Sequence, residues 1–113
     1  MPFQSLTIDP SFPADWRALL DAALPTLEYV VGEPAEEVFV EWRVATNMEG
    51  EPSAQLRLTE AGVCREELFA KAEFADAKAL YWRLSGLWHR IMRTRLKLIW
   101  KSVQDSLADP VGA

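Results

Sequence analysis

The sequence is poor in the residues that build metal centres and covalent catalytic sites. Its 113 residues include one cysteine, Cys64, and one histidine, His89. A single cysteine excludes an intramolecular disulfide framework, and nothing in the chain has the tight ligand spacing of a zinc site. The five glycines stand apart from one another, so no glycine-rich phosphate loop is present. The sequence therefore predicts no enzyme, no metal and no cofactor.

Long apolar runs are also missing. No stretch of about 20 uncharged apolar residues occurs, so no transmembrane helix is expected. The N-terminal residues lack the basic segment and apolar run of a secretory signal. Half of the residues are hydrophobic and 26% are charged, which is typical of a globular chain. We expect one small domain over residues 1–113, in the cytoplasm.

Acidic residues are absent from residues 78–104, although the whole chain has a net charge of −5. Residues 1–77 carry five Lys/Arg and fifteen Asp/Glu, a net charge of −10. Residues 78–104 carry seven Lys/Arg and no acid, a net charge of +7, and Asp105 and Asp109 complete the total. Opposite charges in one short chain can be satisfied within the domain, between subunits or by an external partner.

The basic segment coincides with a proline-free stretch, residues 75–107, that predicts one long amphipathic helix starting near Asp76. Its length would be about 45–50 Å, whereas a compact domain of this size is about 35 Å across. The helix must therefore bend, with Ser85-Gly86 as the favoured position, project from the domain, or pack on another subunit. The apolar residues fall within about 160° of the helix surface: Ala77, Leu80, Tyr81, Leu84, Leu87, Trp88, Ile91, Met92, Leu98 and Ile99.

Positive side chains gather on another side of this helix, within about 80°. They form a candidate stripe for an anionic partner: Arg83, Arg90, Arg93, Lys97 and Lys101. Arg95 departs from this sorting, because it lies at the centre of the apolar arc. A buried arginine needs a carboxylate or carbonyl partner. Arg95 therefore pairs with an acid of the domain, lies beyond the domain, or marks an interface or a pocket for an anionic group.

Before this helix, Pro13 to Leu24 has helical spacing, and Pro25 is expected to end a short helix there. Residues 26–31 are rich in β-branched residues and favour a strand, with further helix as the alternative. Residues 37–46 and 54–59 alternate in polarity and predict a β-hairpin with a long loop. Residues 65–70 fit either a short helix or an edge strand. Residues 1–10 are expected to be extended or loose, and residues 108–113 a loose tail.

The predicted fold class is therefore α+β: a short N-terminal helix, a two- or three-stranded antiparallel sheet, and the long C-terminal amphipathic helix packed on the sheet. The sheet face expected to contact the helix comprises Val38, Val40, Trp42, Val44, Leu56 and Leu58.

For function, these patterns favour a protein-interaction or self-assembling module, adaptor or chaperone-like, that acts as a homodimer or binds another protein. The part of the helix that most exceeds the domain supplies the candidate interface: Leu96, Ile99, Trp100 and Val103. The alternative is a nucleic-acid-binding accessory protein that uses the basic stripe, although the acidic remainder of the chain makes nucleic acid a weaker prediction. A membrane surface is weaker still, because the sheet needs the apolar face.

Overall fold

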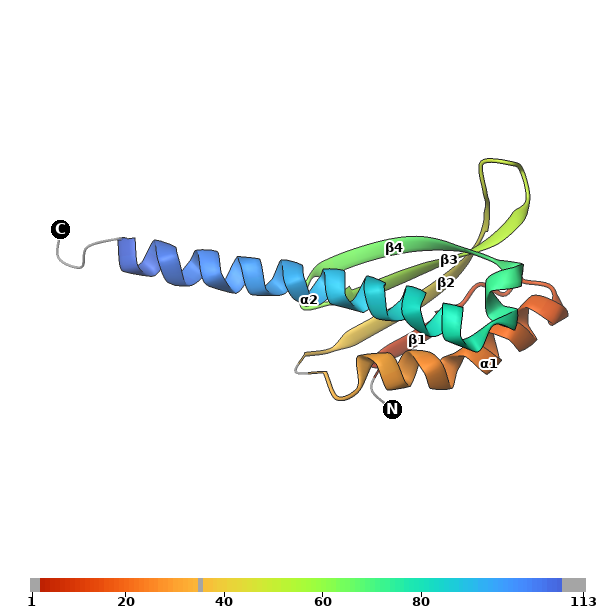
Figure 1. Cartoon of the computed structure of the whole chain (residues 1–113), viewed down its shortest axis with the longest axis horizontal. Helices are drawn as coiled ribbons and strands as arrows, with labels where there is room; N and C mark the ends of the chain where they lie inside the picture. The colour runs from red at the N-terminus through yellow and green to blue at the C-terminus, as the bar shows by residue number, and fades with distance from the viewer. Residues whose placement is uncertain (1–2, 35, 109–113) are drawn as a thin grey trace.

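The structure is a computed structural model that describes residues 3–34 and 36–108. Figure 1 shows a sheet with two helices against it, and the second helix extends far past the sheet. In chain order the elements are β1 (Ser5–Ile8), α1 (Ala14–Val31), β2 (Val38–Thr46), β3 (Pro52–Glu60), β4 (Val63–Ala70), the 3₁₀ helix η1 (Lys71–Ala75) and α2 (Ala77–Ala108).

The sheet has the strand order β1-β2-β3-β4. β1 runs parallel to β2, with Leu6 opposite Val40, and the other two pairs are antiparallel. The α+β class is confirmed, but the expected two or three antiparallel strands are wrong: the described residues form a four-stranded mixed sheet. β1 lies in the segment expected to be extended or loose. A strand of four residues is too short to be recognised from alternating polarity in the sequence. α1 supplies the crossover connection that a parallel pair of strands needs.

α1 is longer than expected, because Pro25 lies inside it instead of ending it. The preferred strand over residues 26–31 is therefore wrong, and the helical alternative is correct. Leu27 and Val31 are buried four residues apart, in line with Leu20 and Ala23 on the core side of the helix. This packing outweighs the β propensity of the segment. The helix ends at Gly32, whose positive φ of 64° suits glycine.

Both helices cover one face of the sheet (Figure 1). Most of the expected sheet residues are buried there, but Val44 is 44% exposed and lines an open cavity beside the start of α1. An aromatic cluster of Trp42, Phe69 and Phe74 closes this end of the core. The segment 65–70, left open between helix and strand, belongs to β4, with Leu56 opposite Glu67.

α2 is continuous from Ala77 to Ala108, and no break occurs at Ser85-Gly86. Asp76 caps its start, because its carboxylate accepts hydrogen bonds from the N–H groups of Lys78 and Ala79. The helix projects: the molecule measures 62 × 31 × 26 Å, and its radius of gyration is 17.2 Å, where a compact domain would have about 13 Å. Residues 109–113, most of the expected loose tail, lie outside the described residues.

Candidate functional site

The second half of α2 is the part of the described chain least covered by the domain. α1 packs beside the first half of α2 and ends before this region begins (Figure 1). We call residues 92–108 the arm, which is about 25 Å long. Ile91 is the last fully buried side chain of α2. Beyond it, large apolar side chains are between 41% and 79% exposed: Leu96, Leu98, Ile99, Trp100, Val103 and Leu107.

Apart from Leu98, which lies 18 residues after the buried Leu80, the large apolar side chains of the arm do not continue the side of α2 that faces the sheet. Residues 18 positions apart project from the same side of a helix, because about 18 residues make five turns. The sheet-facing Leu84, Leu87 and Trp88 are thus followed on the arm by Ser102, Asp105 and Ser106. Apart from Leu98, the sheet-facing side becomes polar once the sheet ends.

Most exposed apolar side chains of the arm lie on another side of α2. Tyr81, whose ring lies 6.0 Å from that of Tyr29 in α1, is followed five turns later by Ile99. Around Ile99 a narrow apolar stripe covers about 80° of the helix and is centred about 115° away from the buried side. We define the arm stripe as Met92, Leu96, Ile99, Val103 and Leu107. The positions 18 residues before Leu96, Val103 and Leu107 are Lys78, Ser85 and His89, so the apolar stripe begins only on the arm, where the domain leaves it open.

Three of the four candidate interface residues, Leu96, Ile99 and Val103, belong to the arm stripe, and Trp100 borders it. The structure leaves all four exposed in the single chain, where a partner can reach them. Met92 and Leu107 were not singled out from the sequence. The sequence signal for these two residues is the spacing of the stripe, whose members follow one another at intervals of four, three, four and four residues. This spacing becomes clear only when the arm is considered separately from the buried first half of α2.

The predicted basic stripe is divided between the domain and the arm. Arg83 pairs with Glu67 at 2.9 Å and with Glu73 at 2.7 Å, and Arg90 pairs with Glu67 at 2.7 Å. Arg83 also donates to the carbonyl oxygen of Leu68 on the open edge of β4. These two arginines therefore hold α2 against the sheet.

The other three basic residues of the stripe, Arg93, Lys97 and Lys101, lie exposed on the arm and form no ion pair within the described part of the chain. They remain accessible to a negatively charged partner.

Arg95 binds an acid of the sheet. Its Nη1 lies 2.8 Å from Oε1 and 3.0 Å from Oε2 of Glu60, the last residue of β3. The N–H points at Oε2, so Oε1 touches the cation without a directed hydrogen bond. One residue earlier, Thr94 accepts a hydrogen bond from Arg65 of β4 at 3.0 Å. These contacts fasten the base of the arm to the β3–β4 hairpin and set the direction in which the arm projects.

A hollow lies at the base of the arm, on the surface of α2. Its volume is about 410 Å³. Gly86 leaves it open, because a Cβ atom added there would meet no atom within 4 Å. The hollow is continuous with the arm stripe through Met92 and Leu96, and its lining consists of Gly86, His89, Arg90, Met92, Arg93 and Leu96.

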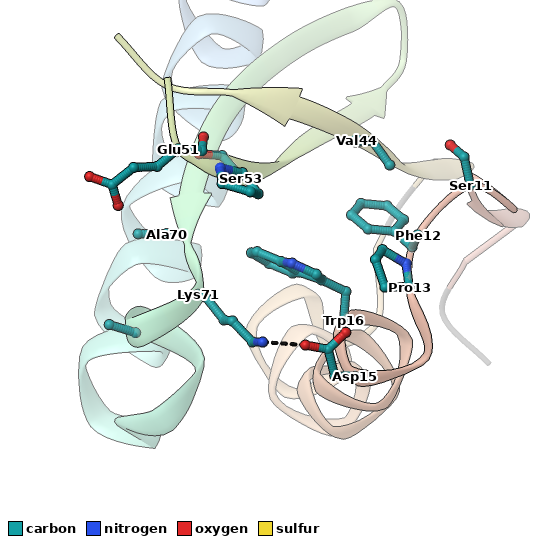
Figure 2. A pocket seen from close by; sticks show the side chains of 12 residues that line it. Ser11, Phe12, Pro13, Asp15, Trp16, Val44, Glu51, Ser53, Ala70 and Lys71 are labelled. Carbon is teal, nitrogen blue, oxygen red and sulfur yellow. Dashed lines mark hydrogen bonds and ion pairs between the residues drawn. The ribbon is translucent and has the colours of Figure 1, made fainter. Parts of the chain in front are cut away.

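A second cavity, of about 800 Å³, lies at the far end of the sheet beside the start of α1 (Figure 2). Phe12 and Trp16 form its apolar wall, and Lys71 crosses its mouth to pair with Asp15. The hydrogen bond from Lys71 lowers the pKa of the Asp15 carboxyl below its ordinary value. The buried Ser53 donates to the carbonyl oxygen of Glu51. These three polar side chains find partners within the chain, and the carboxylate of Glu51 also lines the cavity.

Cys64 and His89 are not brought together. Cys64 is opposite Thr59 in the sheet register and accepts a hydrogen bond from Arg57 on the face away from the helices, whereas His89 lies on α2. Within the described residues no group of three or more Cys, His, Asp or Glu side chains is arranged to hold a metal ion. No helix in this part of the chain has both the length and the apolar character needed to cross a membrane.

Comparisons with protein-family models, with curated proteins and with solved structures gave no match to this chain. The functional argument therefore rests on its own residues.

Proposed function

We propose that this chain is a small protein-interaction module that self-associates through its arm. The observation that carries the proposal is the arm stripe, an exposed row of apolar side chains on a helix that has left its domain, in which the first four members, Met92 to Val103, have coiled-coil spacing. Water-exposed rows of this kind are unfavourable unless a partner buries them. The arm is anchored at its base by the Arg95–Glu60 pair, so it is presented in one direction. Its single cysteine suits a reducing compartment such as the cytoplasm.

The test is the solution mass, measured by light scattering after size exclusion at low and high salt. We expect a salt-resistant species of about 26 kDa, twice the chain mass of 12.8 kDa. Replacing Ile99 and Val103 with Asp should give a folded monomer. Leu98→Asp is the matched control, because Leu98 is similarly exposed on the same helix but lies outside the stripe. The control should remain a dimer. A wild-type chain that stays monomeric at about 100 µM, a concentration about a hundred times a dissociation constant of about 1 µM, would overturn the proposal.

Nucleic-acid binding is the second candidate, supported by the exposed Arg93, Lys97 and Lys101 beside Trp100. It is the weaker one because Arg83 and Arg90 are already paired with acids of β4 and η1. Under this alternative, affinity for single-stranded DNA or RNA falls steeply with salt. Replacing the three exposed basic residues of the arm with Glu should abolish that binding while leaving the solution mass unchanged.

A further inference from the structure

We propose that two copies of the chain pair their arms antiparallel about a two-fold axis, so that the tip of each arm enters the hollow at the base of the other. This inference rests on the proposed self-association and adds the geometry of the partner. The occupant of the arm stripe is then the arm of a second copy.

The first argument is the width of the open apolar surface. The arm stripe covers about 80° of the helix, and the side in line with the sheet carries Ser102, Asp105 and Ser106 beside Leu98. A stripe of this width matches one partner helix, whereas a sheet would need a broader apolar face.

The second argument is the register. Leu96 and Val103 occupy one of the two core positions of a heptad, and Met92 and Ile99 occupy the other. In an antiparallel pair of helices, each kind of core position faces the other kind. Leu96 then meets Ile99 of the second copy, and Met92 meets Val103. The two-fold axis passes midway between residues 97 and 98, so each of these contacts occurs twice in the pair.

The third argument is where the tip then lies. In this register, Val103 of the second copy is level with Met92, and its Leu107 is level with residue 88, beside the hollow at Gly86 and His89. The hollow is open and continuous with the stripe, so it can take an apolar side chain without displacing one. A parallel pair would instead put tip beside tip and leave both hollows empty.

The test uses cysteine pairs on a Cys64→Ser background, which keeps an acceptor for Arg57. Single variants Met92→Cys and Val103→Cys are prepared with tags of different size and mixed under mild oxidation. We expect the mixed disulfide to form at least about tenfold faster than either self-linked disulfide, because only the antiparallel register brings residue 92 to residue 103. Rapid self-linking of Val103→Cys would show a parallel pair and overturn the inference.

A second variant, Gly86→Leu, tests the hollow. Leucine favours a helix more than glycine does, and its Cβ meets no neighbour, so the fold should remain at least as stable. Filling the hollow should weaken the dimer at least about tenfold, as measured by dilution in analytical ultracentrifugation. Ser85→Ala, the adjacent control, should leave the dissociation constant within about threefold. An unchanged dimer in Gly86→Leu would refute seating of the tip in the hollow.

The outcomes separate the two proposals. A monomeric wild-type chain refutes self-association itself, and this arrangement with it. A wild-type dimer that loses affinity in the Ile99 and Val103 variant but self-links at Val103 keeps the proposed function and refutes the antiparallel arrangement alone.

Discussion

The ion pair between Glu60 and Arg95 supports a quantitative prediction about how the arm is anchored. Glu60 is 1% exposed, and the Arg95 side chain is 21% exposed. At 2.8 Å and an effective dielectric constant of about 20, their attraction is about 6 kcal/mol before the cost of removing both charges from water is subtracted. Removing only the cation leaves a buried carboxylate whose Oε1 already lacks a directed hydrogen bond.

Arg95→Met should therefore reduce the free energy of unfolding by about 3 kcal/mol, the lower end of the range for breaking a buried pair, because water reaches part of Arg95. Removing both charges should cost much less. In the double variant Glu60→Gln with Arg95→Met, no charge is buried, so we expect at least half of the loss to be recovered. The single variant Glu60→Gln completes the double-mutant cycle. Lys97→Met serves as the control for removing an exposed cation of the arm.

The assay is urea unfolding followed by circular dichroism, with all variants made in the monomeric Ile99→Asp, Val103→Asp background so that dimer dissociation does not contribute. A loss below about 1 kcal/mol in Arg95→Met would show that the pair behaves as an ordinary surface ion pair. Equal losses in the single and double variants would show that Arg95 acts through packing instead of charge. Either result would refute the reasoning.

Two further predictions concern the domain itself. Pro25→Ala should raise the free energy of unfolding by about 1–3 kcal/mol, measured by urea unfolding, because proline inside α1 removes a backbone hydrogen bond and its exposed ring fills no space in the core; a loss of stability would refute this. Nuclear magnetic resonance titration should place the pKa of the Asp15 carboxyl below its ordinary value, and Lys71→Met should raise that pKa. A carboxyl group whose pKa is lowered in the folded state stabilises the fold at pH values above its pKa in the unfolded chain. This stabilisation is lost as the pH falls through the pKa of the folded state. The difference in melting temperature between wild type and Lys71→Met should therefore be present at about pH 7 and vanish near about pH 2.

The candidate site was partly predictable from the sequence. Helical spacing and length identified an arm that exceeds the domain, and with it Leu96, Ile99, Trp100 and Val103, because periodicity and rise per residue are local properties. The partners of the basic residues were not predictable. Whether Arg83 meets Glu67 or water depends on the register of β4 against β3 and on where α2 crosses the sheet, which no local pattern specifies.

The sequence alone determined the α+β class, the β2–β3 hairpin and the length of α2, since each follows from the period of apolar residues along one continuous segment. Only the tertiary structure decided that β1 joins the sheet and that residues 26–31 continue α1 past Pro25. It also decided that the arm stripe lies on a different side of α2 from the residues that the domain buries. Each of these depends on contacts between segments far apart in the chain. Packing of Leu27 and Val31 in the core outweighs a local strand preference, and the arm stripe stays open because α2 extends past the domain after Ile91.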